Sequence, residues 1–212
     1  MRSEPLVSCI MPTRGRQRWA TDAVRMFNEQ TYSRRELVII DDRMDPSFPR
    51  GLSAALVKYS VSPRVTLGEK RNIAVSRASG EIIMHWDSDD VYRNDRIEHQ
   101  VSMLIESDAD MVGYNTMRFE RIEDGVFLLY RGAPGYPIGV SFCYCRDIWD
   151  QRKYPVENVG EDEGFKDGRR IVTCDAEDRI VARLHGGNTC DKTQAIRDNP
   201  HQWIPLSREC FA

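Results

Sequence analysis

Apolar positions along the first half of the chain follow two alternating patterns. Short apolar runs closed by polar or turn-forming residues predict buried strands, whereas apolar positions three and four residues apart predict helices. The two kinds of element alternate up to residue 114, which predicts a mainly parallel central sheet in a three-layer α/β sandwich. The runs at 6–11, 37–40, 59–62, 81–86 and 111–114 predict strands, and the spacing predicts helices after Arg16 and at 52–57, 70–78 and 97–105.

The second half is less regular, and its topology does not follow from the pattern. Short β-like segments at 127–130, 142–145, 171–173 and 180–184 lie among glycine, proline and charged residues, and a helix is predicted to begin near Glu161. The chain has 212 residues, which is the size of one domain. With 41% hydrophobic and 30% charged residues, the composition is typical of a globular protein and excludes a disordered chain.

Charge and cysteine content narrow the class of protein further. The formal charge of -3 and the pI near 5.9 exclude a strongly basic, general nucleic-acid binder. No apolar stretch approaches the ~20 residues of a membrane-spanning helix, and residues 7–11 are too short for a signal-peptide core, so a cytoplasmic location is expected. The six cysteines form no CxxC pair and predict neither a zinc site nor a disulfide framework; Cys143 and Cys145 are interpreted as core residues.

Three polar clusters follow predicted strands at the point where each strand ends. They are Pro12-Thr13-Arg14, Asp41-Asp42 and Asp87-Ser88-Asp89-Asp90. In open α/β sheets ligands bind outside the carboxyl ends of the strands, so the clusters are predicted to meet at one cleft. The alternative for each cluster is that its residues form turns and cap helices.

Two of these aspartates and two later segments have the chemistry of a reactive site. Asp87 and Asp89, two residues apart in a turn, can converge on Mg²⁺ or Mn²⁺, which prefer oxygen ligands and are commonly held together with substrate phosphates. The segment 161–163 is either an acidic helix start or the source of a carboxylate that removes a proton from a hydroxyl. His185, followed by two glycines, is either a structural histidine or a ligand that completes a metal shell.

Taken in order, these motifs resemble the nucleotide-sugar-dependent glycosyltransferases of family 2, which have the GT-A fold. The segment 7–16 is similar to the family's opening strand and Pro-Thr-x-x-Arg turn, and 37–42 to its strand ending in a nucleoside-binding Asp pair. The segments 71–74 and 78–83 are similar to the helix and strand that lead to the DxD motif, which 87–90 matches. The segment 160–163 is similar to the ED motif, whose Asp is the usual catalytic base, and 185–188 to the segment with a late metal-binding His.

The sequence also departs from the family pattern at three points. Arg43-Met44 follows the Asp pair where the family often has Gly-Ser, and Trp86 is larger than the usual residue before DxD. From residues 1–212, the additional C-terminal helices and membrane segments of larger relatives are not expected, and little protein is expected to define an acceptor site.

The resemblance implies an inverting, metal-dependent transfer of a sugar from a nucleoside diphosphate sugar, expected to be UDP-linked, to an acceptor hydroxyl. The acceptor could belong to a glycan, a lipid-linked sugar, a protein, a small molecule or a modified nucleobase. By resemblance, residues 1–212 form one GT-A domain, with about 1–114 binding the nucleotide sugar and about 115–212 the acceptor. The implied roles are catalytic for Asp162 and Glu161; metal-binding, for Mn²⁺ or Mg²⁺, for Asp87, Asp89 and His185; and nucleotide-sugar-binding for Pro12, Thr13, Arg14, Asp41, Asp42, Arg71, Asp87 and Ser88.

Alternatives from other functional classes remain open. The segment 87–91 also fits the DxDx(T/V) signature of haloacid dehalogenase-like phosphotransferases, in which Asp87 would be the nucleophile. A non-catalytic module that binds nucleotide sugars is a second alternative. A nucleotidyltransferase is less favoured, because no glycine-rich loop with Arg and Lys follows the first strand.

Aromatic residues of the second half have two interpretations, a sugar-stacking wall or part of the core. Trp149 and Phe165, on either side of the 160–163 segment, are predicted as acceptor contacts, and the glycine-rich segment 131–139 as a mobile loop over the cleft. The other aromatics of the possible wall are Tyr130, Tyr136, Phe142, Tyr144 and Tyr154.

Overall fold

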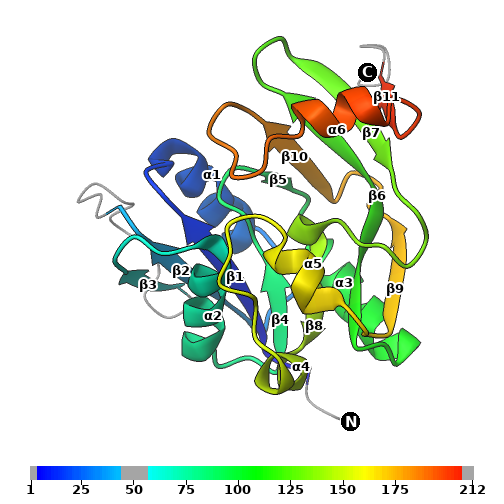
Figure 1. The fold of residues 1–212 in the computed structure, drawn as a ribbon. Helices are drawn as coiled ribbons and strands as arrows, with labels where there is room; N and C mark the ends of the chain where they lie inside the picture. Colours follow the sequence, from blue (N-terminus) through cyan, green and yellow to red (C-terminus); the bar gives the residue numbers. More distant parts are fainter. Residues whose placement is uncertain (1–3, 44–56, 207–212) are drawn as a thin grey trace.

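Four parallel strands form the first half of the sheet in the computed structural model, which describes residues 4–43 and 57–206 (Figure 1). The central strand β1 (Val7–Thr13) lies between β2 (Arg35–Asp41) and β4 (Ile82–His85), and β3 (Val57–Val61) pairs with β2. Every residue of β1 and β4 is buried. Continuous apolar runs form these strands because helices cover both faces of a parallel sheet.

Helices lie on both faces of this sheet and produce the three layers expected from the sequence. Residues of α1 (Gln17–Asn28) and α3 (Arg96–Ser107) share one core with Val7, Cys9 and Met11 of β1. Residues of α2 (Leu67–Arg77), α4 (Arg146–Gln151) and α5 (Glu161–Lys166) share a second core with Ile10 of β1. Successive side chains of a strand point to opposite faces, so one strand supplies both cores.

The second half of the sheet is built around the long strand β6 (Met111–Arg121). It pairs antiparallel with β7 (Val126–Arg131) and β8 (Cys143–Cys145), and parallel with β9 (Ile171–Asp175) and β10 (Ile180–Leu184). Strand β8 also pairs with β4 and thereby joins the two halves into one sheet of the order β11-β7-β6-β8-β4-β1-β2-β3. The remaining elements are β5 (Val91–Tyr92), the 3₁₀ turn η1 (Gly139–Ser141), α6 (Thr193–Asp198) and β11 (Trp203–Pro205); in Figure 1, α6 and β11 lie beside β7.

Most elements expected in the first half are confirmed, and two expectations change. Val57 begins β3 instead of ending a helix, because the apolar spacing at 52–57 is too short to separate helix from strand; residues 52–56 lie outside the described residues. Strand β6 continues seven residues beyond the predicted 111–114, to Arg121. Elements β5, β11, α4 and α6 were not anticipated. Within 4–43 and 57–206, no helix has both the length and the apolar character needed to cross a membrane.

Candidate functional site

A cavity of about 790 Å³ opens beside the carboxyl ends of β1, β2 and β4. It is lined by these strand ends, α2, η1, α5 and residues of the segment 182–192. The prediction that the three polar clusters meet at one cleft is therefore confirmed as geometry. Among the sequence-predicted residues, those that line the cavity are Pro12, Thr13, Arg14, Asp42, Arg71, Asp87, Asp89, Glu161 and Asp162.

The two aspartates at the carboxyl end of β2 have different surroundings. Asp41 is turned away from the cavity, since its carboxylate accepts hydrogen bonds from the Tyr59 hydroxyl of β3 at 3.0 Å and from the Arg43 amide at 2.9 Å. Asp42 lines the cavity and pairs with Lys70 at 2.9 Å and with Arg14 at 3.7 Å. Burial lowers the pKa of Lys70, although the Asp42 carboxylate opposes that change. Asp42 and the two cations form a charged corner at this end of the cavity.

A second group of carboxylates follows β4. Asp89 Oδ2 accepts hydrogen bonds from Arg16 at 2.6 Å, His185 Nε2 at 2.8 Å and Asn188 at 3.3 Å. The Gly187 amide donates to His185 Nδ1 at 3.0 Å, so Nε2 carries the imidazole proton in this arrangement. The structure thus brings together Asp89 and His185, two of the three expected metal ligands.

The residues next to Asp89 in the chain have fewer hydrogen bonds to their side chains than Asp89 has. Among the described residues, Asp87 Oδ1 is buried without a hydrogen-bond partner and lies 3.9 Å from Arg71, and Asp90 Oδ2 is likewise buried without one. Burial, with the nearby Asp89 charge, raises the pKa of Asp87 and raises that of Asp90 well above its usual value. Ser88 is fully buried, and its hydroxyl also has no partner. A small cation bound among these carboxylates would reduce the repulsion between them.

The donor set therefore fits a hard divalent cation. Carboxylate oxygens crowded together in a buried turn, two of them unpartnered, are the ligands that Mg²⁺ or Mn²⁺ prefers. In 4–43 and 57–206, however, no group of three His, Cys, Asp or Glu side chains is already gathered around one point. Binding a cation would thus require Asp89 and His185 to exchange their present partners.

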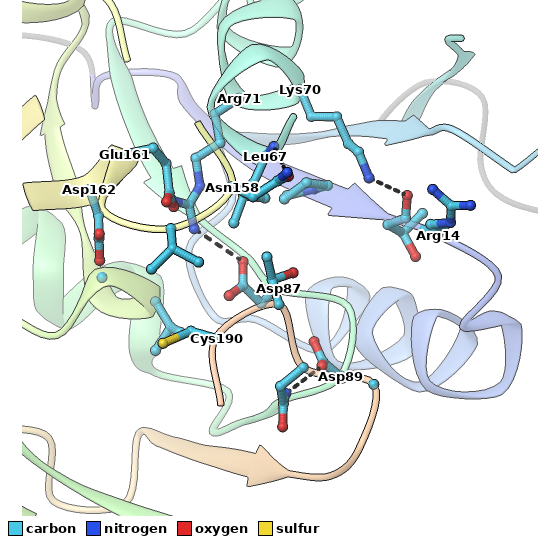
Figure 2. Close-up of a pocket in the computed structure, with 18 of the residues that line it drawn as sticks. Arg14, Leu67, Lys70, Arg71, Asp87, Asp89, Asn158, Glu161, Asp162 and Cys190 are labelled. Carbon is cyan, nitrogen blue, oxygen red and sulfur yellow. Dashed lines mark hydrogen bonds and ion pairs between the residues drawn. The ribbon is translucent and has the colours of Figure 1, made fainter. Parts of the chain in front are cut away.

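The opposite wall carries the two residues of the acidic helix start. Helix α5 follows Gly160, whose φ of 86° is in the left-handed region open to glycine. Glu161, the first residue of the helix, is paired with the buried Arg71 guanidinium, and Figure 2 shows Arg71 reaching from α2 to lie beside Glu161 and Asp87. Burial raises the pKa of Glu161, with Arg71 opposing the change. Glu161 therefore joins α5 to α2.

Asp162 is half-buried and lines the cavity next to Glu161. Its Oδ1 accepts a hydrogen bond from the Glu163 amide at 3.0 Å. On its other side lies Gly139 of η1: a Cβ at that position would overlap Asp162 Oδ2 and come within 3.0 Å of Asp162 Cγ. The carboxylate thus fits against bare backbone, and of the two predicted catalytic residues it is the one without a charged partner.

Trp149 and Phe165, which were predicted to contact the acceptor, lie in the core and not at the cavity. Trp149 is 4% and Phe165 0% exposed, both belong to the second core, and neither lines the cavity. Phe165 stacks on Tyr154 at 4.0 Å between ring centroids, so large aromatic area is used to hold α5 onto the sheet. Four aromatics of the possible stacking wall are buried, as the core interpretation expects, whereas Tyr136 is 47% exposed. None of the wall's members lines the cavity: Tyr130, Tyr136, Phe142, Tyr144, Trp149 and Tyr154.

Part of the cavity lining is apolar and comes from β6, β10 and the residues around η1. Gly139 and Ile138, at the end of the predicted mobile loop, line the cavity; the motion of that loop stays a prediction. The apolar lining here consists of Phe119, Ile138, Val140, Ala182 and Leu184.

The sequence reasoning missed Arg16, Lys70 and Asn188 as site residues. Arg16 lies in the Pro-Thr-x-x-Arg turn, which was the available signal for it.

Comparison with known proteins agrees with this geometry. The model of the family described as glycosyl transferase family 2 matches residues 8–156. The glycosyltransferase GlyG of Streptococcus pneumoniae is 27% identical over 131 residues, which are 59% of this chain and 43% of that protein. The chain thus spans less than half of the length of that relative.

Two solved structures share the fold. The mannosyltransferase PcManGT of Pyrobaculum calidifontis, in complex with GDP-Man and Mn²⁺, has a TM-score of 0.69 at 17% identity, covering 94% of this chain and 62% of that one. Residues 1–349 of TarS from S. aureus, in complex with UDP-GlcNAc, give 0.65 at 16% identity, covering 87% and 60%. Both are GT-A glycosyltransferases, so the expected fold class is confirmed.

Proposed function

The chain belongs to glycosyl transferase family 2, whose model matches well over half of it, and from this premise we propose that it transfers a sugar from a nucleoside diphosphate sugar to an acceptor hydroxyl. The transfer inverts the anomeric carbon and uses a divalent cation, Mn²⁺ or Mg²⁺. The donor is UDP-linked, as in the TarS complex with UDP-GlcNAc. One observation carries the proposal: Asp162 and the Asp87–Asp89 turn, from different elements, line one cavity.

Different residues bind the nucleoside and the diphosphate with its cation. Asp42, with Lys70 and Arg14, holds the nucleoside end of the donor, and Arg71 adds a permanent positive charge near the diphosphate. Asp87 and Asp89, with His185, hold the cation, which supplies positive charge against the charge that develops on the departing diphosphate.

Asp162 acts on the acceptor. Its carboxylate accepts the proton of the attacking hydroxyl while the bond to the anomeric carbon forms from the face opposite the diphosphate. It can do so because it has no cationic partner in the part of the chain that the structure describes, in contrast to Glu161, which is paired with Arg71. General-base assistance of this kind is typically worth about 10²–10⁴-fold in rate.

The test needs no knowledge of the acceptor. Purified protein is incubated with Mn²⁺ and a panel of UDP-glucose, UDP-galactose, UDP-GlcNAc and GDP-mannose, and slow donor hydrolysis is measured. For the best donor, Asp162→Asn should lower turnover by about 10²-fold or more. Asp167→Asn, which makes the same charge change just after α5 at an exposed position, serves as the matched control.

Three results would contradict the proposal. Asp162→Asn activity within about tenfold of wild type would remove Asp162 as the base. Nucleotide binding without turnover of any donor would favour the non-catalytic binding module. A phosphoryl adduct trapped on Asp87 would favour the phosphotransferase alternative.

A further inference from the structure

Arg16 connects two parts of the chain that are far apart in sequence. It stands immediately before α1, and its side chain is 21% exposed within the cavity. One guanidinium nitrogen donates to Asp89 Oδ2 at 2.6 Å, and the other donates to the backbone carbonyl of Gly187. Arg16 thus ties the carboxylate turn after β4 to the segment that follows β10.

The hydrogen bonds of Asp89 are unevenly shared. All three of its side-chain donors, from Arg16, His185 and Asn188, bond to the same oxygen, Oδ2. A carboxylate oxygen offers about two lone-pair directions, so Oδ2 is fully used. Nearby, Asp87 and Asp90 each keep a buried oxygen without a hydrogen-bond partner. Side-chain hydrogen-bond donors are therefore concentrated on one carboxylate of a group that holds three.

A divalent cation and the Arg16 guanidinium cannot both occupy Asp89 Oδ2, because two like charges would then face each other in a buried site. His185 is bound to the same exchange. Its Nε2 is hydrogen-bonded to Asp89 Oδ2 and its Nδ1 accepts from the Gly187 amide, so a cation that binds Asp89 Oδ2 displaces the imidazole from that oxygen as well. Cation binding at Asp89 would thus break the contact of Arg16 with Asp89.

We infer that Arg16 is an exchangeable counter-ion: it neutralises Asp89 in the ligand-free protein and turns to the donor's diphosphate when a divalent cation takes its place. This inference rests on the proposed function for the identity of the diphosphate. Arg16 lines the same cavity, and a guanidinium binds phosphate oxygens through two parallel hydrogen bonds. The exchange couples cation binding to donor binding through one side chain.

The exchange gives Arg16→Met two effects of opposite sign. Without Arg16 the cation meets no competitor, so Mn²⁺ alone should bind more tightly. The diphosphate then loses a partner, so UDP should bind more weakly at saturating Mn²⁺. A side chain that only supported the fold would weaken both, and one that only repelled cations would leave UDP unaffected.

The experiment measures the two equilibria separately. Mn²⁺ binding is followed by electron paramagnetic resonance without nucleotide, and UDP binding by calorimetry at saturating Mn²⁺. We expect Arg16→Met to change each affinity by about five- to tenfold, in opposite directions, which lies within the usual range of coupling between two sites. Arg18→Met removes the same charge from an exposed position of α1 that does not line the cavity, and should change neither affinity. Arg16→Gln repeats the test should the methionine variant fold poorly.

The outcomes separate this inference from the proposed function. Unchanged or weaker Mn²⁺ binding by both Arg16 variants, or UDP binding as tight as in wild type, overturns the counter-ion role even if the wild-type protein turns over its donor. Tighter Mn²⁺ binding together with weaker UDP binding by the Arg16 variants would support the exchange. If the wild-type protein at the same time turns over no donor, the proposed transfer reaction is refuted.

Discussion

Replacing Arg71 by methionine should remove a large part of the stability of the fold. Arg71 and Glu161 are paired with side chains only 4% and 5% exposed, and breaking a buried ion pair by removing one partner costs about 3–5 kcal/mol. The lower end applies here, because burial already raises the pKa of Glu161 and protonation of the unpaired carboxyl relieves part of the cost. We therefore expect Arg71→Met to lower the free energy of unfolding by about 3 kcal/mol.

Urea denaturation followed by tryptophan fluorescence measures this loss. The double variant Arg71→Met/Glu161→Met should recover most of it, because apolar side chains of similar volume can replace a buried pair with little net change. Arg25→Met is the control: its pair with Glu29 is 60% and 53% exposed and should contribute about 0.3–0.5 kcal/mol. A cost for Arg71→Met no larger than that of Arg25→Met, or a double variant less stable than Arg71→Met, would refute the reasoning.

Three further results are expected. Hydrogen bonds from Lys58, Ser79 and Ser8 outweigh burial and lower the pKa of Glu36, so the wild-type protein should lose stability as the pH falls below about 4.3 and through the folded-state pKa, whereas Glu36→Gln should lose less in urea titrations at each pH. Gly139→Ala should lower kcat by about tenfold or more through displacement of the Asp162 carboxylate, with an unchanged KM for the donor and no added effect on Asp162→Asn; an equal loss in both backgrounds would contradict this. UDP with Mn²⁺ should slow alkylation of Cys190, which lines the cavity, while Cys9, whose pKa burial raises to about 12, should stay unmodified in mass spectra with or without the nucleotide.

The first half of the fold could be predicted because its strands are buried on both faces. In β1 and β2 the apolar runs are continuous, and the polar residues that end them mark the ligand-binding edge. Strand β6 is different, since buried positions such as Met117 and Phe119 alternate with polar ones, and its parallel partners β9 and β10 lie far along the chain. The local pattern indicates these partner strands, but not that they pair with β6, and the length of β6 depends on that pairing.

The same division holds for the site. Asp162 and the 87–90 turn carry recognisable motifs, and the structure brings them to one cavity. The interactions of Arg16 with Asp89 and Gly187 depend on tertiary proximity, which the sequence does not encode at a fixed spacing. The acceptor contacts were wrong because an aromatic residue beside a motif serves equally well as core, as Phe165 does against Tyr154.

The position of β1 in the sheet affects how the protein can be made. One edge of β1 pairs with β2 and the other with β4, and Val7 stands opposite both Arg35 and Ile82. While the ribosome is still synthesising the chain, the second edge therefore remains open until Ile82 and its neighbours have emerged. An apolar strand with a free edge readily joins the same strand of another nascent copy. Fragments truncated after β3 should therefore collect in inclusion bodies, and slower translation of that stretch should reduce the yield of the full-length protein.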